Sequence, residues 1–357
     1  MKLLLPISVI ACAAVATVHA GTPTLYVFGD SLSDIGTLKQ LTLGLLPSEP
    51  YWEGRFSSGP VWNEYLAPLL GYNLYNKAIG GATSDNKYSS VLDSAPLVPV
   101  DIPSCQNQIS LFKVLNPFYW LSSTVNSDIA VLEIGANDFF AQVSNLVSGT
   151  LTPESFINTL STTVLDQLEQ LHYIGFRNFF IPDLAHIQTT PFAKMENVEA
   201  LANSTVTGYN QVLAQKVSAW AASKTGLGFV TVAPIGKFVD VTALSPAVSQ
   251  ALGLTDTKTP CVSGSILDIA EAENMLTALL DFAFGASEDK LCPDPSTYYF
   301  FDTVHPSERV QRLFGYYTKH AIDAARSGKT YEMTEANMLS LIKTYNLGTP
   351  APKPARI

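Results

Sequence analysis

Short hydrophobic runs rich in β-branched and aromatic residues alternate along this chain with longer segments whose apolar residues follow helical spacing. The short runs predict strands at 24–28, 129–134, 178–181 and 228–232, with a weaker strand at 74–76. The runs that start at 129, 178 and 228 are apolar at consecutive positions. Such runs are typical of strands that are buried on both faces of a parallel sheet.

Helical spacing predicts helices at 109–121, 153–174, 196–224 and 308–326. The second of these has one apolar face, because its large side chains recur every three to five residues: Phe156, Leu160, Leu165, Leu168 and Leu171. Alternation of strands and helices implies right-handed crossovers. The expected fold class is therefore α/β, a three-layer α/β/α sandwich around a central parallel sheet.

The ends of the chain differ in composition from its middle. Residues 3–18 are apolar, follow Lys2 and end in small residues, so residues 1–20 are expected to be a secretory signal peptide cleaved after Ala20. A membrane anchor is the alternative, but the run is short and lacks a positive flank. No linker or repeat divides 21–346, which we expect to form one domain, and the Pro-rich stretch 347–357 reads as a flexible tail.

Charge and cysteine content narrow the partners and the compartment. The net charge of −10 argues against nucleic acid and anionic membrane surfaces, and no later segment is apolar enough to span a membrane. Three cysteines remain after cleavage, and we expect Cys261–Cys292 to pair across a predicted helix at 266–284, leaving Cys105 free or buried. No Cys-x-x-Cys spacing suggests a metal site. Asn203 begins the N-glycosylation acceptor sequence Asn-Ser-Thr.

A candidate nucleophile follows the first predicted strand directly, in the sequence Gly-Asp-Ser-Leu-Ser-Asp at 29–34. A tight turn there would present Ser31 to solvent, and a following helix would add positive potential at its N-terminus. Gly-Ala-Asn-Asp at 135–138 follows the strand at 129. Functional groups gather at the carboxyl ends of parallel strands, so both loops are expected at one edge of the sheet.

A serine nucleophile needs a base, a carboxylate that orients the base, and donors for the oxyanion. Asp302 and His305 are three residues apart, so one turn could join the carboxylate to the imidazole, although an exposed polar turn, a helix cap or half of a metal site would give the same spacing. His172 and His320 lie in predicted helices and are more typical of structural positions. His186 follows a strand and is kept as a weaker alternative near the pocket.

Two further segments could supply oxyanion donors. Asn137 offers a side-chain NH₂ that does not change its protonation state, with an Asx turn or a helix N-cap as the alternative role. Asp138 is expected to form such an Asx turn or N-cap. Gly80 and Gly81 offer a backbone N–H without a side chain, and an ordinary turn is the alternative there.

Taken together, these segments resemble the SGNH, or GDSL, family of serine ester hydrolases, in its larger, plant-like branch. The family pattern has a Gly-Asp-Ser block, a glycine, a Gly-x-Asn-Asp block and an Asp-x-x-His block, and this chain has all four in order. The resemblance implies a flavodoxin-like sandwich and an acyl-enzyme. It implies Ser31 as nucleophile, His305 as base and Asp302 as orienting acid. The oxyanion donors would be the Ser31 and Gly81 N–H groups and the Asn137 amide.

The substrate is less well defined than the chemistry. A tyrosine, a phenylalanine and two tryptophans near the first block could form a sugar platform or an acyl groove, or could simply pack: Tyr51, Trp52, Phe56 and Trp62. We expect a secreted, monomeric esterase without cofactor that acts on acetyl or short acyl esters, including acetylated carbohydrates. The alternatives are a lipase or (lyso)phospholipase and a non-catalytic binding protein of the same fold. The absence of Gly-x-Ser-x-Gly argues against an α/β-hydrolase nucleophile elbow.

Overall fold

The computed structural model describes residues 21–87, 102–263 and 290–351 of the 357-residue chain. A five-stranded sheet forms its centre, in the order β2-β1-β3-β4-β5 with every neighbouring pair parallel. The strands are β1 Thr24–Gly29, β2 Asn73–Asn76, β3 Ile129–Glu133, β4 Asn178–Pro182 and β5 Val230–Ala233. This order and the flanking helices confirm the predicted α/β/α sandwich, and the order is the flavodoxin-like one.

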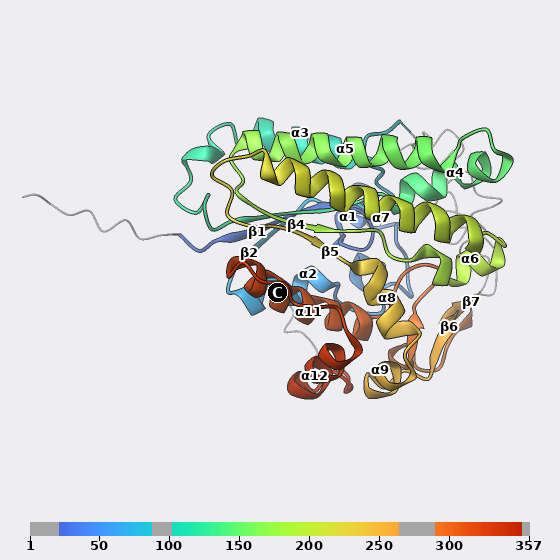
Figure 1. Ribbon diagram of the computed structural model, residues 1–357. Coiled ribbons are helices and arrows are strands. Elements are labelled where there is room, and N and C mark those ends of the chain that lie inside the picture. The colour runs from blue at the N-terminus through green and yellow to red at the C-terminus, as the bar shows by residue number, and fades with distance from the viewer. Residues whose placement is uncertain (1–20, 88–101, 264–289, 352–357) are drawn as a thin grey trace, which may run out of the picture.

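Helices cover both faces of the sheet (Figure 1). One layer holds α3 Cys105–Leu115, α4 Ala136–Ser148, α5 Pro153–Ile174, α6 Pro191–Met195 and α7 Glu199–Ala222. The other holds α2 Trp62–Leu70, α8 Ile235–Ala243, α9 Pro246–Ala251, α11 Glu308–Arg326 and α12 Glu335–Tyr345. A short helix, α1 Thr37–Leu41, follows the first strand.

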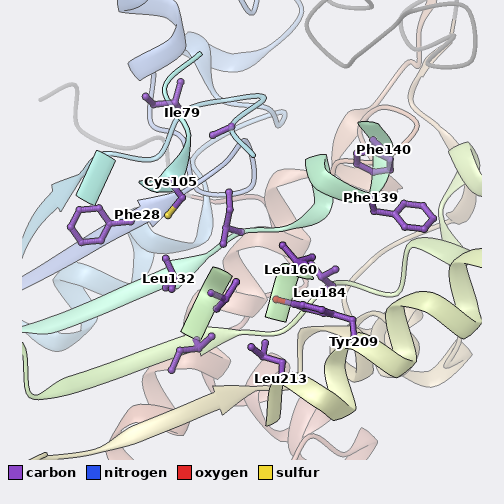
Figure 2. Close-up of a cluster of buried hydrophobic side chains, with 14 of the residues drawn as sticks. Phe28, Ile79, Cys105, Leu132, Phe139, Phe140, Leu160, Leu184, Tyr209 and Leu213 are labelled. Carbon is purple, nitrogen blue, oxygen red and sulfur yellow. The ribbon is translucent and has the colours of Figure 1, made fainter. Parts of the chain in front are cut away.

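Alternate residues of each central strand enter two separate hydrophobic clusters. Val27 and Val131 face α2 and α11, whereas Phe28 and Leu132 face α3 and α5. Figure 2 shows the second pair near Cys105, which is buried at the start of α3. Every residue of β3 and β4 is buried, as the continuous apolar runs predict. Strand β5 is only partly buried because it lies at the sheet edge.

The helix boundaries follow the sequence prediction closely in two cases and depart from it in others. The predicted ranges 153–174 and 308–326 are those of α5 and α11. The range predicted at 109–121 is two elements, α3 and the 3₁₀ turn η2 Tyr119–Leu121, because Pro117 interrupts the helix. Helix α7 begins at Glu199, after the separate α6. Helices α2, α4, α6, α8, α9 and α12 lie in segments for which no helix was predicted from the sequence.

Two small sheets and a disulfide lie beside the main sheet. Their strands are β6 Asp256–Pro260 with β9 Tyr298–Phe300, and β7 Val262–Ser263 with β8 Lys290–Leu291. Further 3₁₀ turns are η1 Trp52–Gly54, η3 Ile187–Thr189 and η5 Pro295–Thr297. The disulfide joins Cys261 to Cys292, as predicted. The helix predicted between the two cysteines lies outside the described residues.

The packed chain continues further than the predicted domain boundary at 346. Leu347 is buried, and the Arg312 guanidinium donates hydrogen bonds to the carbonyls of Leu347 and Thr349. Residues 347–349 are therefore held against α11, which corrects the start of the predicted tail. The predicted signal peptide, 1–20, lies outside the described residues. Within the described ranges, no helix has the length and apolarity needed to cross a membrane.

The disulfide gives a prediction about stability. Replacing both Cys261 and Cys292 by serine should lower the free energy of unfolding by about 2–4 kcal/mol, because the unfolded chain regains loop entropy. The bridge closes a sequence separation of 31 residues. Urea unfolding of the double variant and of the oxidised and reduced wild type measures the change. The reduced wild type should match the variant, and equal midpoints for all three samples would contradict the prediction.

Candidate active site

The candidate nucleophile lies in a turn at the carboxyl end of β1. Gly29 ends this strand, and a Cβ there would lie 2.3 Å from the Glu133 carbonyl oxygen of β3, so only glycine fits. The Asp30 carboxylate accepts a hydrogen bond from the Leu32 N–H, and the Asp30 carbonyl accepts one from the Ser33 N–H. These bonds close the tight turn that was predicted around Ser31.

The structure brings the three predicted catalytic residues together from opposite ends of the chain. The His305 Nε2 lies 2.7 Å from the Ser31 Oγ, and its Nδ1 lies 2.6 Å from the Asp302 Oδ2. All three residues are buried. The Asp302 Oδ1 accepts hydrogen bonds from the N–H groups of Val304 and His305, so the carboxylate shapes the loop that carries the imidazole.

Asp302 has one further donor that the sequence analysis missed. The Tyr51 hydroxyl donates to the Asp302 Oδ2 at 2.7 Å, across 251 residues of sequence. Burial by itself raises the pKa of Asp302, but the His305 ring and the backbone donors outweigh it and hold that pKa below its ordinary value. The carboxylate therefore stays ionised beside the Nδ1–H of His305.

Helix α1 does not direct its N-terminus at the nucleophile, which corrects the expectation from the sequence. It begins at Thr37, and its first N–H groups are taken by Asp34. The Asp34 carboxylate also accepts a hydrogen bond from the Gly80 N–H at 2.8 Å. Asp34 thus ties the nucleophile segment to the glycine loop instead of leaving the helix end open to a substrate.

The occupied Gly80 N–H leaves Gly81 as the available glycine donor. Gly81 has a φ of +81°, which favours glycine. Among the described residues, the N–H groups of Gly81 and Ser31 donate no hydrogen bond. Asn137, in the first turn of α4, donates one Nδ2 hydrogen to the Ala82 carbonyl at 2.9 Å. Its second Nδ2 hydrogen has no acceptor within the described part of the chain.

Asp138 makes long-range contacts rather than the local cap that the sequence suggested. Its carboxylate accepts hydrogen bonds from the N–H and the Oγ of Ser84, at 2.9 and 2.6 Å. Burial raises the pKa of Asp138 to about 7. The side chain therefore fastens the loop that carries Gly81 to the start of the helix that carries Asn137.

A second buried carboxyl group lies beneath the nucleophile turn. Glu133 ends β3 opposite Gly29 and accepts a hydrogen bond from the Ser33 Oγ at 2.9 Å. Burial raises the pKa of Glu133 to about 7, and burial together with Glu133 raises the pKa of Asp30 well above its ordinary value. At least one proton is thus held between these two carboxyl groups near neutral pH.

Comparison with known proteins identifies the family of this chain. Residues 25–317 match the family model of the GDSL-like lipases and acylhydrolases.

The chain belongs to the GDSL family of lipases and acylhydrolases.

It is a carboxylic ester hydrolase by that membership. A GDSL esterase/lipase of Arabidopsis thaliana is 25% identical over 343 residues, which cover 85% of this chain and 90% of that protein. The phosphatidylcholine-sterol acyltransferase of Aeromonas hydrophila is 29% identical over 243 residues, or 68% of this chain. That match spans 66% of the acyltransferase, just under two thirds. A solved lipase from a goat rumen metagenome has a TM-score of 0.41 at 12% identity, covering 85% of this chain and 98% of that one.

The other histidines of this GDSL hydrolase lie apart from the triad. The His172 Nδ1 contacts the Phe176 carbonyl at the end of α5, and the His320 Nε2 contacts the Tyr345 hydroxyl. Both positions are structural, as their predicted helices suggested. His186 does reach the cavity beside Ser31, where it lines the wall.

The aromatic residues near the first block do not form one platform. Tyr51 and Phe56 are buried around the triad, and the Phe56 ring lies 5.0 Å from the His305 ring. The Arg55 guanidinium lies over Trp52. Trp62 is buried, donates its Nε1–H to the Ser33 Oγ, and is the member of the group that lines the cavity. Packing therefore explains most of these aromatic residues.

An apolar cavity adjoins Ser31 and His305. It lies between α8 and α11 and opens to solvent. Large apolar side chains form much of its wall: Trp62, Phe140, Ile187, Phe238, Val239 and Phe314. Polar side chains in the lining are fewer: Asp30, Ser31, His186, Thr190, His305 and Gln311.

The Tyr51 hydroxyl predicts a measurable effect on the triad. In Tyr51→Phe, Asp302 loses a donor, so its pKa should rise and kcat/KM should fall by about 10- to 150-fold, since hydrogen bonds to charged groups contribute about 1.5–3 kcal/mol. The acid limb of the kcat/KM profile should move to higher pH. Tyr119→Phe removes a hydroxyl from Asp128 away from the site and serves as the control. Identical profiles for both variants would contradict the assignment.

The buried carboxyl groups predict how stability depends on pH. The folded protein retains protons on Glu133 and Asp138 up to about pH 7, whereas unfolded carboxyls release theirs near about pH 4. The free energy of unfolding should therefore fall as pH rises from about 4 to about 7, and these groups should have no further effect above that range.

Glu133→Gln isolates one of these groups, because glutamine keeps an acceptor for Ser33 and has no proton to lose. Urea midpoints at pH 5 and pH 8 should differ less in this variant than in the wild type. An equal or larger fall in the variant would show that Glu133 does not contribute.

Proposed function

We propose that this GDSL hydrolase cleaves carboxylic esters through an acyl-enzyme on Ser31. His305 removes the proton from the Ser31 Oγ as the oxygen attacks the ester carbonyl, and returns it to the departing alcohol. Asp302 holds the imidazole with Nδ1–H facing the carboxylate. Water, activated by the same histidine, then releases the acid. The distances of 2.7 and 2.6 Å along the triad support these roles.

The Ser31 and Gly81 N–H groups and the Asn137 amide are proposed as donors to the oxyanion. This proposal is supported because the two N–H groups and one hydrogen of the Asn137 amide donate no hydrogen bond within the described residues. The Gly80 N–H is excluded from this role because Asp34 accepts it. No step of this reaction requires a metal or an organic cofactor.

The apolar cavity is the observation that favours a substrate class. Its lining is mostly apolar and includes several large side chains, whereas an acetyl group has only one methyl group to bury there. We therefore favour acyl chains of medium or greater length, the lipase-like alternative, over the acetyl esters preferred from sequence. Each added methylene buried in the cavity is worth up to about 0.8 kcal/mol of binding.

We further propose that the chain is secreted after cleavage behind Ala20. The Cys261–Cys292 disulfide supports an oxidising compartment. Asn203 is exposed on α7, which is compatible with its proposed glycosylation, although its Oδ1 accepts a hydrogen bond from Gln188. The non-catalytic alternative has little support, because such a protein would not need an intact Ser31–His305–Asp302 arrangement.

Hydrolysis of p-nitrophenyl esters from two to sixteen carbons tests both the mechanism and the acyl preference. Wild-type kcat/KM should rise from acetate to chains of at least eight carbons. Ser31→Ala should lose about 10³-fold or more at every length, with unchanged thermal unfolding. Activity that survives in Ser31→Ala rejects the serine mechanism, and a maximum at acetate rejects the acyl assignment.

Val239→Phe tests whether the cavity itself holds the acyl chain. The larger ring at a lining position should lower kcat/KM for long chains more than for acetate. Val241→Phe, on the same helix but outside the lining, is the matched control. Equal losses at all chain lengths would separate the cavity from acyl binding.

A further inference from the structure

A second histidine–carboxylate pair lies in the wall of the same cavity. The His186 Nδ1 is 2.8 Å from the Asp240 Oδ1 of α8, and His186 lines the cavity that contains Ser31 and His305. The two side chains are 17% and 40% exposed, whereas Ser31 is 2% exposed. The pair therefore lies nearer to solvent than the nucleophile. The proposed reaction does not use it.

Local structure fixes the position of the His186 ring. The Asn210 side chain both donates to and accepts from the backbone of Leu184, and Asp183 accepts the Gly236 N–H at 2.9 Å. A Cβ at Gly236 would lie 2.6 Å from the His186 Nε2. Only glycine at this position of α8 leaves room for the imidazole, so the chain is built to hold the ring against the helix.

The pairing with Asp240 also decides what the ring can offer. A carboxylate accepts the Nδ1–H, so the neutral imidazole keeps a lone pair on Nε2. In the described residues, Nε2 has no hydrogen-bond partner. A neutral imidazole nitrogen in this state accepts a hydrogen bond from an O–H group. Most other side chains around it in the cavity wall are apolar.

We propose that His186, oriented by Asp240, binds a free hydroxyl on the alcohol part of the ester. This inference rests on the proposed function, in which the acyl chain occupies the apolar inner cavity. The alcohol then extends from Ser31 toward solvent, where the partly exposed pair lies. The chemistry is a hydroxyl close to the ester bond, which a partial glyceride or an acylated sugar would supply.

Three esters of one medium-length acid test the proposal: the propyl ester, the glycerol 1-monoester and the 6-O-ester of methyl glucoside. The propyl ester has no free hydroxyl. The wild type should prefer at least one hydroxyl-bearing ester, mainly through a lower KM. For each enzyme, the measured ratio is kcat/KM for that hydroxyl-bearing ester divided by kcat/KM for the propyl ester. In His186→Leu this ratio should fall by about 3- to 10-fold, the usual range for a neutral hydrogen bond. The preferred ester identifies the alcohol as glycerol or sugar.

Gly236→Ala and Asp240→Ala perturb the same site without altering the histidine. The first displaces the ring and the second removes the partner of Nδ1, so both should reduce the ratio in the same direction. His320→Leu removes a histidine outside the cavity and should leave the ratio unchanged. Thermal unfolding of each variant confirms that it is folded before ratios are compared.

The outcomes separate this inference from the proposed function. A wild type that hydrolyses none of the three esters rejects the proposed function. A wild type that hydrolyses them without preference for a hydroxyl, or with a preference that folded His186→Leu and Gly236→Ala retain, rejects only the role of His186. A fall of the ratio in His320→Leu as large as in His186→Leu also rejects it.

Discussion

The parallel pairing of β1 with β3 is the constraint on which the site depends. It sets Gly29 opposite Glu133, so that the strands approach closely and their carboxyl ends are level. The serine turn leaves the first strand there, and the loop to Asn137 leaves the second. Both loops must open at this edge because a parallel sheet directs all its carboxyl ends the same way. His305 lies in the loop before α11 and contacts Ser31 from there. Helix α11 packs with α2 against one face of the sheet.

Buried carboxyl groups hold the loops at this edge of the sheet in place. Burial removes them from water, which disfavours their charged form. Asp34, Asp138 and Asp302 each accept several hydrogen bonds, and each joins segments that are distant in sequence. Burial raises the pKa of Asp34 and Asp138, whereas the histidine and the backbone donors keep Asp302 ionised. The proposed mechanism requires a charge only on the carboxylate that faces His305. The others work as hydrogen-bond acceptors that position loops.

The cavity gives the site a second, apolar half. Ser31 and His305 line this cavity together with apolar side chains from several elements, α8 and α11 among them. The two polar histidines of this cavity are held differently. His305 is sealed between Asp302 and Ser31, whereas His186 is paired on one side only. In the proposed site, His305 thus belongs to the reacting groups, whereas the Nε2 of His186 is left to accept a hydrogen bond from the substrate.

Local sequence pattern predicted the fold class and the helices α5 and α11, and the resemblance to the GDSL family pointed to Ser31, Asp302 and His305. Buried parallel strands give continuous apolar runs in the sequence, and apolar residues recur at helical spacing along α5 and α11. Asp302 and His305 are close enough in sequence to lie in one turn. Only the tertiary structure decided that Tyr51 donates to Asp302, that Asp34 occupies the Gly80 N–H, and that Asp138 reaches Ser84. Those contacts join residues 46 to 251 positions apart. A local pattern cannot specify such pairs, because the packing of the whole chain around the sheet brings them together.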